Sequence, residues 1–157
     1  MGACMKRHLL VLAAGVPLIT AIDCYHYFSA QQAVTPAPAR NCVADALAGI
    51  PQVAQVKNQR RTSGLEYFGV ALNDSTAKGH RRDVSIWHRT DPTGDQDTLW
   101  ASTTWSLLKG PSPTEKQSVA TLAARVLTHL QERCAPGAPS RVTCELDGRS
   151  LPCSAAG

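Results

Sequence analysis

The stretch SPTEKQSVATLAARVLTHLQER, residues 112–133, predicts the longest helix of the chain. Ser112 is a favourable N-cap, Pro113 suits the first helical position, and Glu115 completes a capping box with the serine. Beyond this start, apolar residues recur at the three- and four-residue spacing of one buried helical face. These are Val119, Leu122, Ala123, Val126, Leu127 and Leu130. An apolar helical face of this length needs a surface to cover, and the preceding residues predict a sheet.

Four strand patterns precede this helix. Residues 53–62 and 65–72 flank a Ser-Gly pair that favours a tight turn, so together they predict a hairpin. Two more strands are expected over residues 81–89 and 98–108, on either side of a polar loop.

A shorter helix is expected over residues 42–50, between the N-cap Asn41 and Pro51. The order helix, strands, helix predicts an α+β fold with about four antiparallel strands and both helices packed on one face. We assign residues 41–139 to this domain. Because many small secreted domains share this order, it indicates no particular activity.

Residues 140–157 are expected to form a C-terminal hairpin tail around an Asp-Gly pair. With residues 147–150 as its loop, Cys144 lies opposite Cys153. Directly opposed residues of an antiparallel pair come close enough for a disulfide. The tail is therefore expected to contain an internal disulfide between Cys144 and Cys153.

Two further cysteines mark the ends of the predicted helices, Cys42 at the start of the first and Cys134 at the end of the last. Antiparallel helices on one sheet face would bring these ends together, so we expect a disulfide between them. Pairings of Cys42 with Cys144 or Cys153 stay open, because spacing alone does not fix connectivity. None of the four cysteines has the close partner of a zinc-binding Cys-x-x-Cys pair, so neither a metal nor a cofactor is expected.

The first residues carry an export signature, in which basic residues precede an apolar run over residues 9–22. This run of 14 residues is short for a membrane span, which favours a cleaved signal peptide. No small-x-small cleavage site follows, however, and the segment up to Phe28 is long enough for a retained anchor. We assign residues 1–30 to one of these two roles, with lipid attachment at Cys24 as a third alternative.

Residues 31–40, QQAVTPAPAR, predict a Pro/Ala-rich linker between the membrane segment and the domain. The export signature and the even number of cysteines beyond it point to an oxidising compartment. We therefore expect a periplasmic or membrane-anchored protein whose domain lies outside the cytoplasm. From Asn41 onward, 13 Lys and Arg face 11 Asp and Glu, a net charge of +2, so nucleic acid is not an expected partner.

The third and fourth predicted strands place two tryptophans opposite each other. In a hairpin centred on residues 90–97, Trp87 faces Trp100 beside Arg89, on the face turned away from the helices. Exposed paired tryptophans beside an arginine suit flat ligands, sugars or partner side chains. The alternative is a second small core, covered by the tail or the linker. His88 falls on the other face and is expected to be a core histidine.

Two Arg-Arg pairs form a second candidate site. Arg60 and Arg61 lie near the end of the first predicted strand, and Arg81 and Arg82 open the third. Because guanidinium groups match the geometry of phosphates, the headgroup of a lipid or a glycolipid is a candidate ligand. The alternative is a set of solvated charges that deters edge-to-edge aggregation.

These features favour a non-enzymatic envelope protein, secreted or held at the membrane by its N-terminal segment. Through its open sheet face it would bind an envelope protein, a glycan or a lipid headgroup. The sequence contains no Gly-rich phosphate loop, serine-elbow motif or nucleophilic-cysteine motif. The alternative is a small periplasmic hydrolase built from His80, Asp83 and the conceivable nucleophile Ser85.

Overall fold

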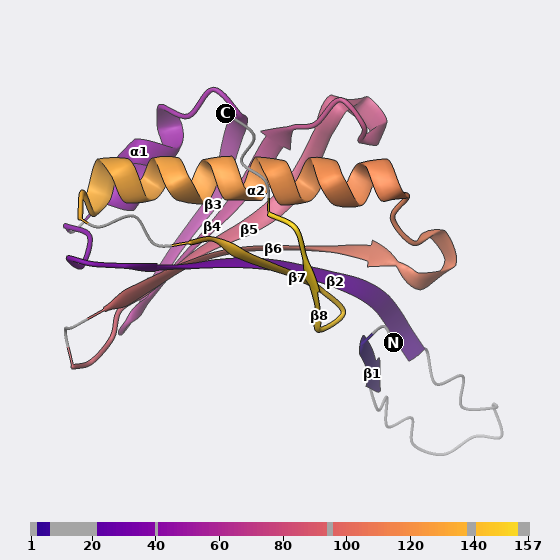
Figure 1. The fold of residues 1–157 in the computed structure, drawn as a ribbon, viewed down its shortest axis with the longest axis horizontal. Coiled ribbons are helices and arrows are strands. Elements are labelled where there is room, and N and C mark those ends of the chain that lie inside the picture. The colour runs from indigo at the N-terminus through magenta and orange to yellow at the C-terminus, as the bar shows by residue number, and fades with distance from the viewer. Residues whose placement is uncertain (1–2, 7–21, 40, 94–95, 138–140, 154–157) are drawn as a thin grey trace, which may run out of the picture.

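The computed structural model describes residues 3–6, 22–39, 41–93, 96–137 and 141–153. The predicted α+β class is confirmed, but the described sheet has eight strands instead of about four. Helices α1 and α2 lie together on one face of this sheet (Figure 1). The elements in chain order are β1 (Ala3–Lys6), β2 (Ile22–Val34), α1 (Cys42–Ala48), β3 (Val53–Thr62), β4 (Leu65–Asn73), η1 (Lys78–His80), β5 (Arg81–Arg89), β6 (Asp97–Ser106), η2 (Leu107–Lys109), α2 (Pro113–Cys134), β7 (Thr143–Leu146) and β8 (Arg149–Leu151).

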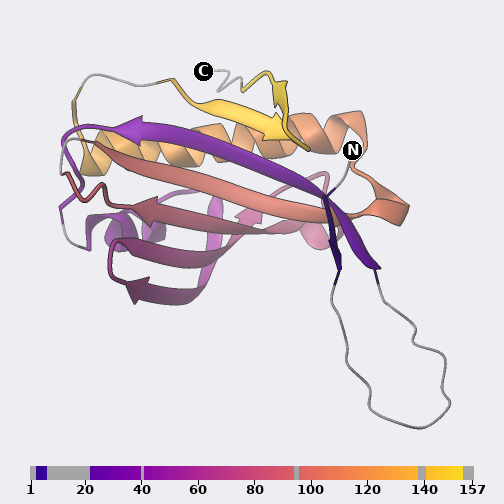
Figure 2. The same ribbon diagram turned by 90° about the horizontal axis from the view of Figure 1, so that it is seen from below.

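The sheet joins a central meander to strands from both ends of the chain. Its order is β3-β4-β5-β6-β2-β7-β8, with β1 paired to β2 (Figure 2). Every paired neighbour is antiparallel. Strands β3 to β6 are the four that the sequence predicted, with ends that differ by two residues or fewer. The added strands complete the sheet beyond β6.

Strand β2 is the largest correction to the sequence prediction. Its residues were expected to end a membrane segment and to begin a linker at residue 31, yet they pair along ten residues of β6 and four of β7. Phe28, Ala30 and Val34 point to the core and are buried. Residues 7–21, most of the predicted apolar run, lie outside the described residues. Among the described helices, none is long and apolar enough to cross a membrane.

Helix α2 begins as its sequence predicts. The Ser112 hydroxyl accepts a hydrogen bond from the Glu115 amide, and the Glu115 carboxylate accepts one from the Ser112 amide at 2.9 Å. The apolar face of α2 then packs with α1 over the sheet. Fully buried side chains from the two layers form this core, the largest being Phe28, Phe68, Leu47, Leu72, Ile86, Leu99, Leu127 and Leu130. Neither of these helices lies on the other sheet face, which is called the outer face below (Figure 1).

The C-terminal hairpin forms, but its loop is shorter than expected. Leu146 pairs with Arg149, which leaves a two-residue turn instead of the four-residue loop. Asp147 and Gly148 both adopt positive φ, 52° and 73°, as a tight turn of the type favoured in two-residue hairpins requires. Cys144 is therefore opposite Leu151, not opposite a cysteine.

Both predicted disulfides are present. Cys42 is bonded to Cys134 and joins the start of α1 to the end of α2, with 5.6 Å between their Cα atoms. Cys144 is bonded to Cys153, also with a Cα separation of 5.6 Å, although Cys153 lies beyond the end of β8. The bonds indicate an oxidising compartment outside the cytoplasm.

Candidate functional site

Three aromatic side chains from adjacent strands form a row on the outer face. As predicted, Trp87 of β5 lies opposite Trp100 of β6, and their rings stack at a centroid distance of 5.6 Å. Tyr67 of β4 lies opposite Trp87 on its other side, with ring centroids 4.5 Å apart and planes tilted by 57°. We call Tyr67, Trp87 and Trp100 the aromatic row. Arg60 of β3 lies opposite Tyr67 and extends the row to the sheet edge.

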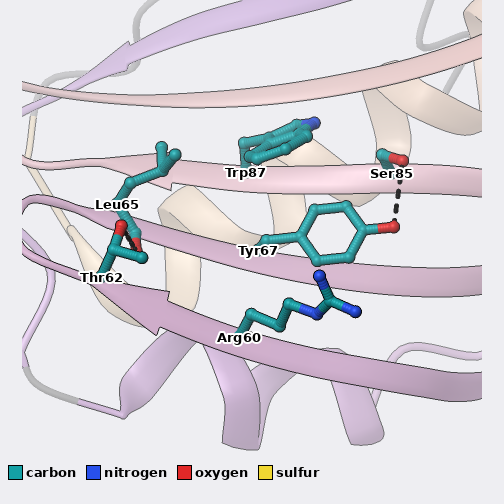
Figure 3. Close-up of a pocket in the computed structure, with 6 residues that line it drawn as sticks. All are labelled: Arg60, Thr62, Leu65, Tyr67, Ser85 and Trp87. Atoms are coloured by element: carbon teal, nitrogen blue, oxygen red, sulfur yellow. Dashed lines mark hydrogen bonds between the residues drawn. The ribbon is translucent and has the colours of Figure 1, made fainter.

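A hollow of about 470 Å³, the first hollow, opens along this row. Its lining residues are Arg60, Thr62, Leu65, Tyr67, Ser85 and Trp87 (Figure 3). The Ser85 hydroxyl and the Tyr67 hydroxyl approach to 3.5 Å at one end of it. Tyr67 was not predicted as a site residue, although the alternation that places the two tryptophans on one face also places Tyr67 there once β4 is aligned with β5.

A second hollow of about 320 Å³ lies beyond Tyr67 and Ser85, which line both hollows. Its floor follows a run of small residues, because Gly69, Ser85 and Ser102 lie opposite one another on β4, β5 and β6. Small side chains beside large rings leave a trough on the sheet surface. The outer face therefore offers one aromatic hollow and one polar hollow side by side.

The four predicted phosphate-binding arginines do not come together. Along β4, Arg61 lies opposite Glu66, whereas Arg81 lies opposite Asn73. Seven residues of extended strand separate those positions by roughly 20 Å. A single phosphate cannot bridge the two pairs, so the predicted joint site is not formed.

The Arg82 side chain is occupied by contacts within the protein and is not available to bind a ligand. Its guanidinium lies 3.0 Å from Asp74 and 3.1 Å from Glu115, and it stacks 4.8 Å from the ring centre of Trp105. The Asp74 carboxylate also accepts a hydrogen bond from Ser118 of α2 at 2.8 Å. These contacts tie the start of β5 to the start of α2. Arg82 thus stabilises the packing of α2 against the sheet.

The residues of the alternative hydrolase do not form a catalytic chain of hydrogen bonds in the described part of the molecule. Asp83 is paired with Lys57 at 2.5 Å, and the Ser85 hydroxyl faces Tyr67. His80 is exposed after a glycine at the end of η1. A nucleophile and its base need a mutual hydrogen bond, and these three side chains have none among the described contacts.

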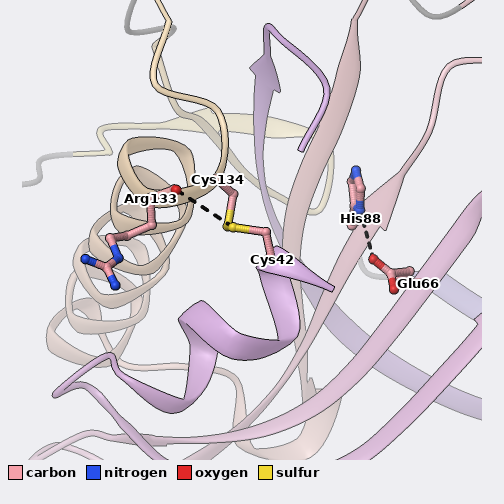
Figure 4. The surroundings of a disulfide bond; sticks show 5 residues. All are labelled: Cys42, Glu66, His88, Arg133 and Cys134. Carbon is pink, nitrogen blue, oxygen red and sulfur yellow. Dashed lines mark hydrogen bonds and ion pairs between the residues drawn. A yellow bond between two sulfur atoms is a disulfide. The ribbon is translucent and has the colours of Figure 1, made fainter. Parts of the chain in front are cut away.

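His88 is buried on the core side, as predicted, but between two carboxylates. It is 4% exposed, and its Nδ1 atom lies 3.1 Å from Glu66 (Figure 4). Its Nε2 atom lies 2.7 Å from Asp97. One buried imidazole ring is thus the shared partner of two carboxylates. Burial raises the pKa of Glu66, yet hydrogen bonds from His88 and Arg61 outweigh burial and hold that pKa below its usual value.

Replacing His88 by leucine is expected to lower the free energy of unfolding by about 3 kcal/mol, because two buried carboxylates lose their shared partner. The matched control is His80→Asn, at an exposed position whose positive φ of 56° asparagine also tolerates, with an expected change within about 0.5 kcal/mol. Denaturant unfolding of both variants measures the difference. Equal losses in the two variants would contradict a special role for the buried position.

Acid is expected to destabilise the fold through Asp74 and Glu66. Burial raises the pKa of Asp74, but hydrogen bonds from Thr76, Arg82 and Ser118 together lower it below the usual 3.8. A carboxyl group with a lowered folded-state pKa stabilises the fold above its unfolded-state pKa and loses that contribution as the pH falls through the folded-state value. The free energy of unfolding should therefore fall steadily below about pH 4.5. Denaturant titrations at several pH values test this, and Asp74→Asn should flatten the slope.

Comparisons of the chain with protein-family models, with curated proteins and with solved structures found no match. The function therefore has to be inferred from the geometry of the outer face. The feature of that face with the most chemical content is the aromatic row with its two hollows.

Proposed function

We propose that this protein is an exported, non-enzymatic binding protein that contacts another component of the cell envelope through its outer sheet face. The single observation that supports this most is the aromatic row. Three large rings from three strands gather on the face that neither α1 nor α2 covers, and aromatic residues dominate the energetics of binding surfaces.

The location in the envelope is part of the same proposal. Two disulfides are consistent with an oxidising compartment, and the basic residues before an apolar run are typical of exported chains. A periplasmic protein and a membrane-anchored protein both satisfy these features. Fractionation followed by intact-mass measurement distinguishes them, since the mass reports cleavage and lipid attachment.

Trp100→Ala is expected to reduce the yield of crosslinked envelope partners about tenfold, as truncation of a central aromatic anchor does at other interfaces. Leu108→Ala is the matched control, because Leu108 is 96% exposed and lies outside the aromatic row. Chemical crosslinking in intact envelopes, with quantification of each product, compares the two variants. Unchanged partner yields in Trp100→Ala, with the fold intact by circular dichroism, would contradict binding through this face.

A further inference from the structure

The aromatic residues of the first hollow form a corner. Seen from outside, with the helices behind the sheet, the ring of Tyr67 is viewed face-on and that of Trp87 nearly edge-on (Figure 3). Their planes differ by 57°, so one ring forms a floor and the other a wall. If a flat, partly apolar ligand ring lay on Tyr67, the edge of that ligand ring would therefore contact Trp87.

Arg60 provides a positive charge on the side opposite the wall. It is exposed, lines the first hollow, and forms no ion pair with any described residue. Two nearby cations differ in this respect, because Lys57 is paired with Asp83 and Arg61 with Glu66. The first hollow thus has one unneutralised guanidinium, which fits a carboxylate on the ligand.

The second hollow has a different chemistry. Hydroxyl groups of Ser85, Ser102 and Thr104 line it, together with the mutually neutralised pair Lys57 and Asp83. Hydroxyl groups both donate and accept hydrogen bonds, so they match a ligand unit that carries hydroxyl groups and no net charge. On one face of a strand, successive side chains stand about 7 Å apart, so neighbouring units of one chain can reach both hollows.

We infer that the outer face binds a glycan chain, with a carboxylate-bearing sugar in the first hollow and a neutral sugar in the second. A sugar ring combines apolar C–H faces for the aromatic corner with hydroxyl edges for the polar trough. The inference rests on the proposed function, since it names the class of envelope component that this face contacts.

The test uses the full chain and two probes that differ only in charge. One is a tetrasaccharide of alternating glucuronate and N-acetylglucosamine, and the other is its carboxyl-reduced, neutral form. Binding is followed by tryptophan fluorescence and by titration calorimetry at constant salt. The acidic probe is expected to bind about fivefold more tightly than the neutral one, the preference that one partly exposed charge-assisted contact supports.

Two arginine variants identify the source of this preference. Arg60→Gln should remove it, so that both probes bind equally. Arg81→Gln makes the same change in net charge at the exposed first residue of β5, away from the first hollow. It should leave the preference intact. Tyr67→Leu should weaken both probes together. Fluorescence of the unmutated chain reports contact at the row even where a variant fails to fold.

Three results would overturn the inference: no binding of either probe, equal binding of both to the unmutated chain, or an equal effect of the two arginine variants. Each is separable from failure of the proposed function. If Trp100→Ala still abolishes crosslinking to envelope partners while neither probe binds, the face is a binding surface for a component other than a glycan. If crosslinking is unaffected by Trp100→Ala, the proposed function itself fails.

Discussion

A chain truncated to begin at Asn41 is expected not to fold, whereas a chain truncated to begin at Ile22 is expected to fold. The shorter chain lacks β2, and with it ten paired residues on β6 and four on β7. It also loses the buried side chains of Phe28, Ala30 and Val34. Removal of a single buried Phe side chain costs about 3–5 kcal/mol, and a domain of this size has only about 5–15 kcal/mol in total.

Far-ultraviolet circular dichroism and thermal melting of the two chains measure this difference. The chain from Ile22 should melt cooperatively, and the chain from Asn41 should show no transition. A cooperative transition in the shorter chain, at a similar temperature, would mean that β3 to β6 and the helices form an independent unit. Because the pairing of β2 with β6 begins at Tyr25, we expect any cleavage of the N-terminus to lie before this residue, and the intact mass of the mature protein measures where it occurs.

Loss of the Cys42–Cys134 disulfide is expected to lower the free energy of unfolding by about 5 kcal/mol, against about 3 kcal/mol for Cys144–Cys153. The reason is the length of chain that each bond closes, since the two cysteines of the first are 92 residues apart and those of the second only 9. Closing a longer loop removes more conformational entropy from the unfolded chain.

Two double variants test this expectation, Cys42→Ala with Cys134→Ala and Cys144→Ala with Cys153→Ala. Each serves as the control for the other, because each removes two sulfur atoms and one covalent bond. Denaturant unfolding at neutral pH gives both free energies. A larger loss from the C-terminal pair would contradict the loop-length argument and would indicate that β7 depends on its hairpin for its place beside β2.

Local sequence patterns predicted the parts of the fold whose contacts join residues close together in the sequence. The capping box at Ser112 fixed the start of α2, and the alternation around residues 90–97 gave the register that opposes Trp87 and Trp100. Strand β2 was missed because its first residues were assigned to the end of a membrane segment and residues 31–34 to a Pro/Ala-rich linker. Its pairing with β6 is long-range, so no local pattern indicates it.

Only part of the candidate site was predicted, because local patterns indicate pairings within a hairpin but not the alignment of one hairpin with another. Trp87 and Trp100 are joined by one hairpin, so their pairing was visible in the sequence. Tyr67 belongs to a neighbouring hairpin, and its place in the row depends on how two hairpins align. The arginines were grouped by residue type alone, which says nothing of position along a strand, and the sheet register separates Arg61 from Arg81.

The position of β2 between β6 and β7 also bears on when this protein folds. Strand β2, from the start of the chain, pairs with β7, which ends at Leu146, so this part of the sheet cannot form until β7 has been synthesised. Pairings between such distant segments form slowly, because their loop entropy is lost before any contact compensates for it. The pairing of β2 with β7 is therefore expected to be among the last steps of folding, after the end of the chain has been synthesised.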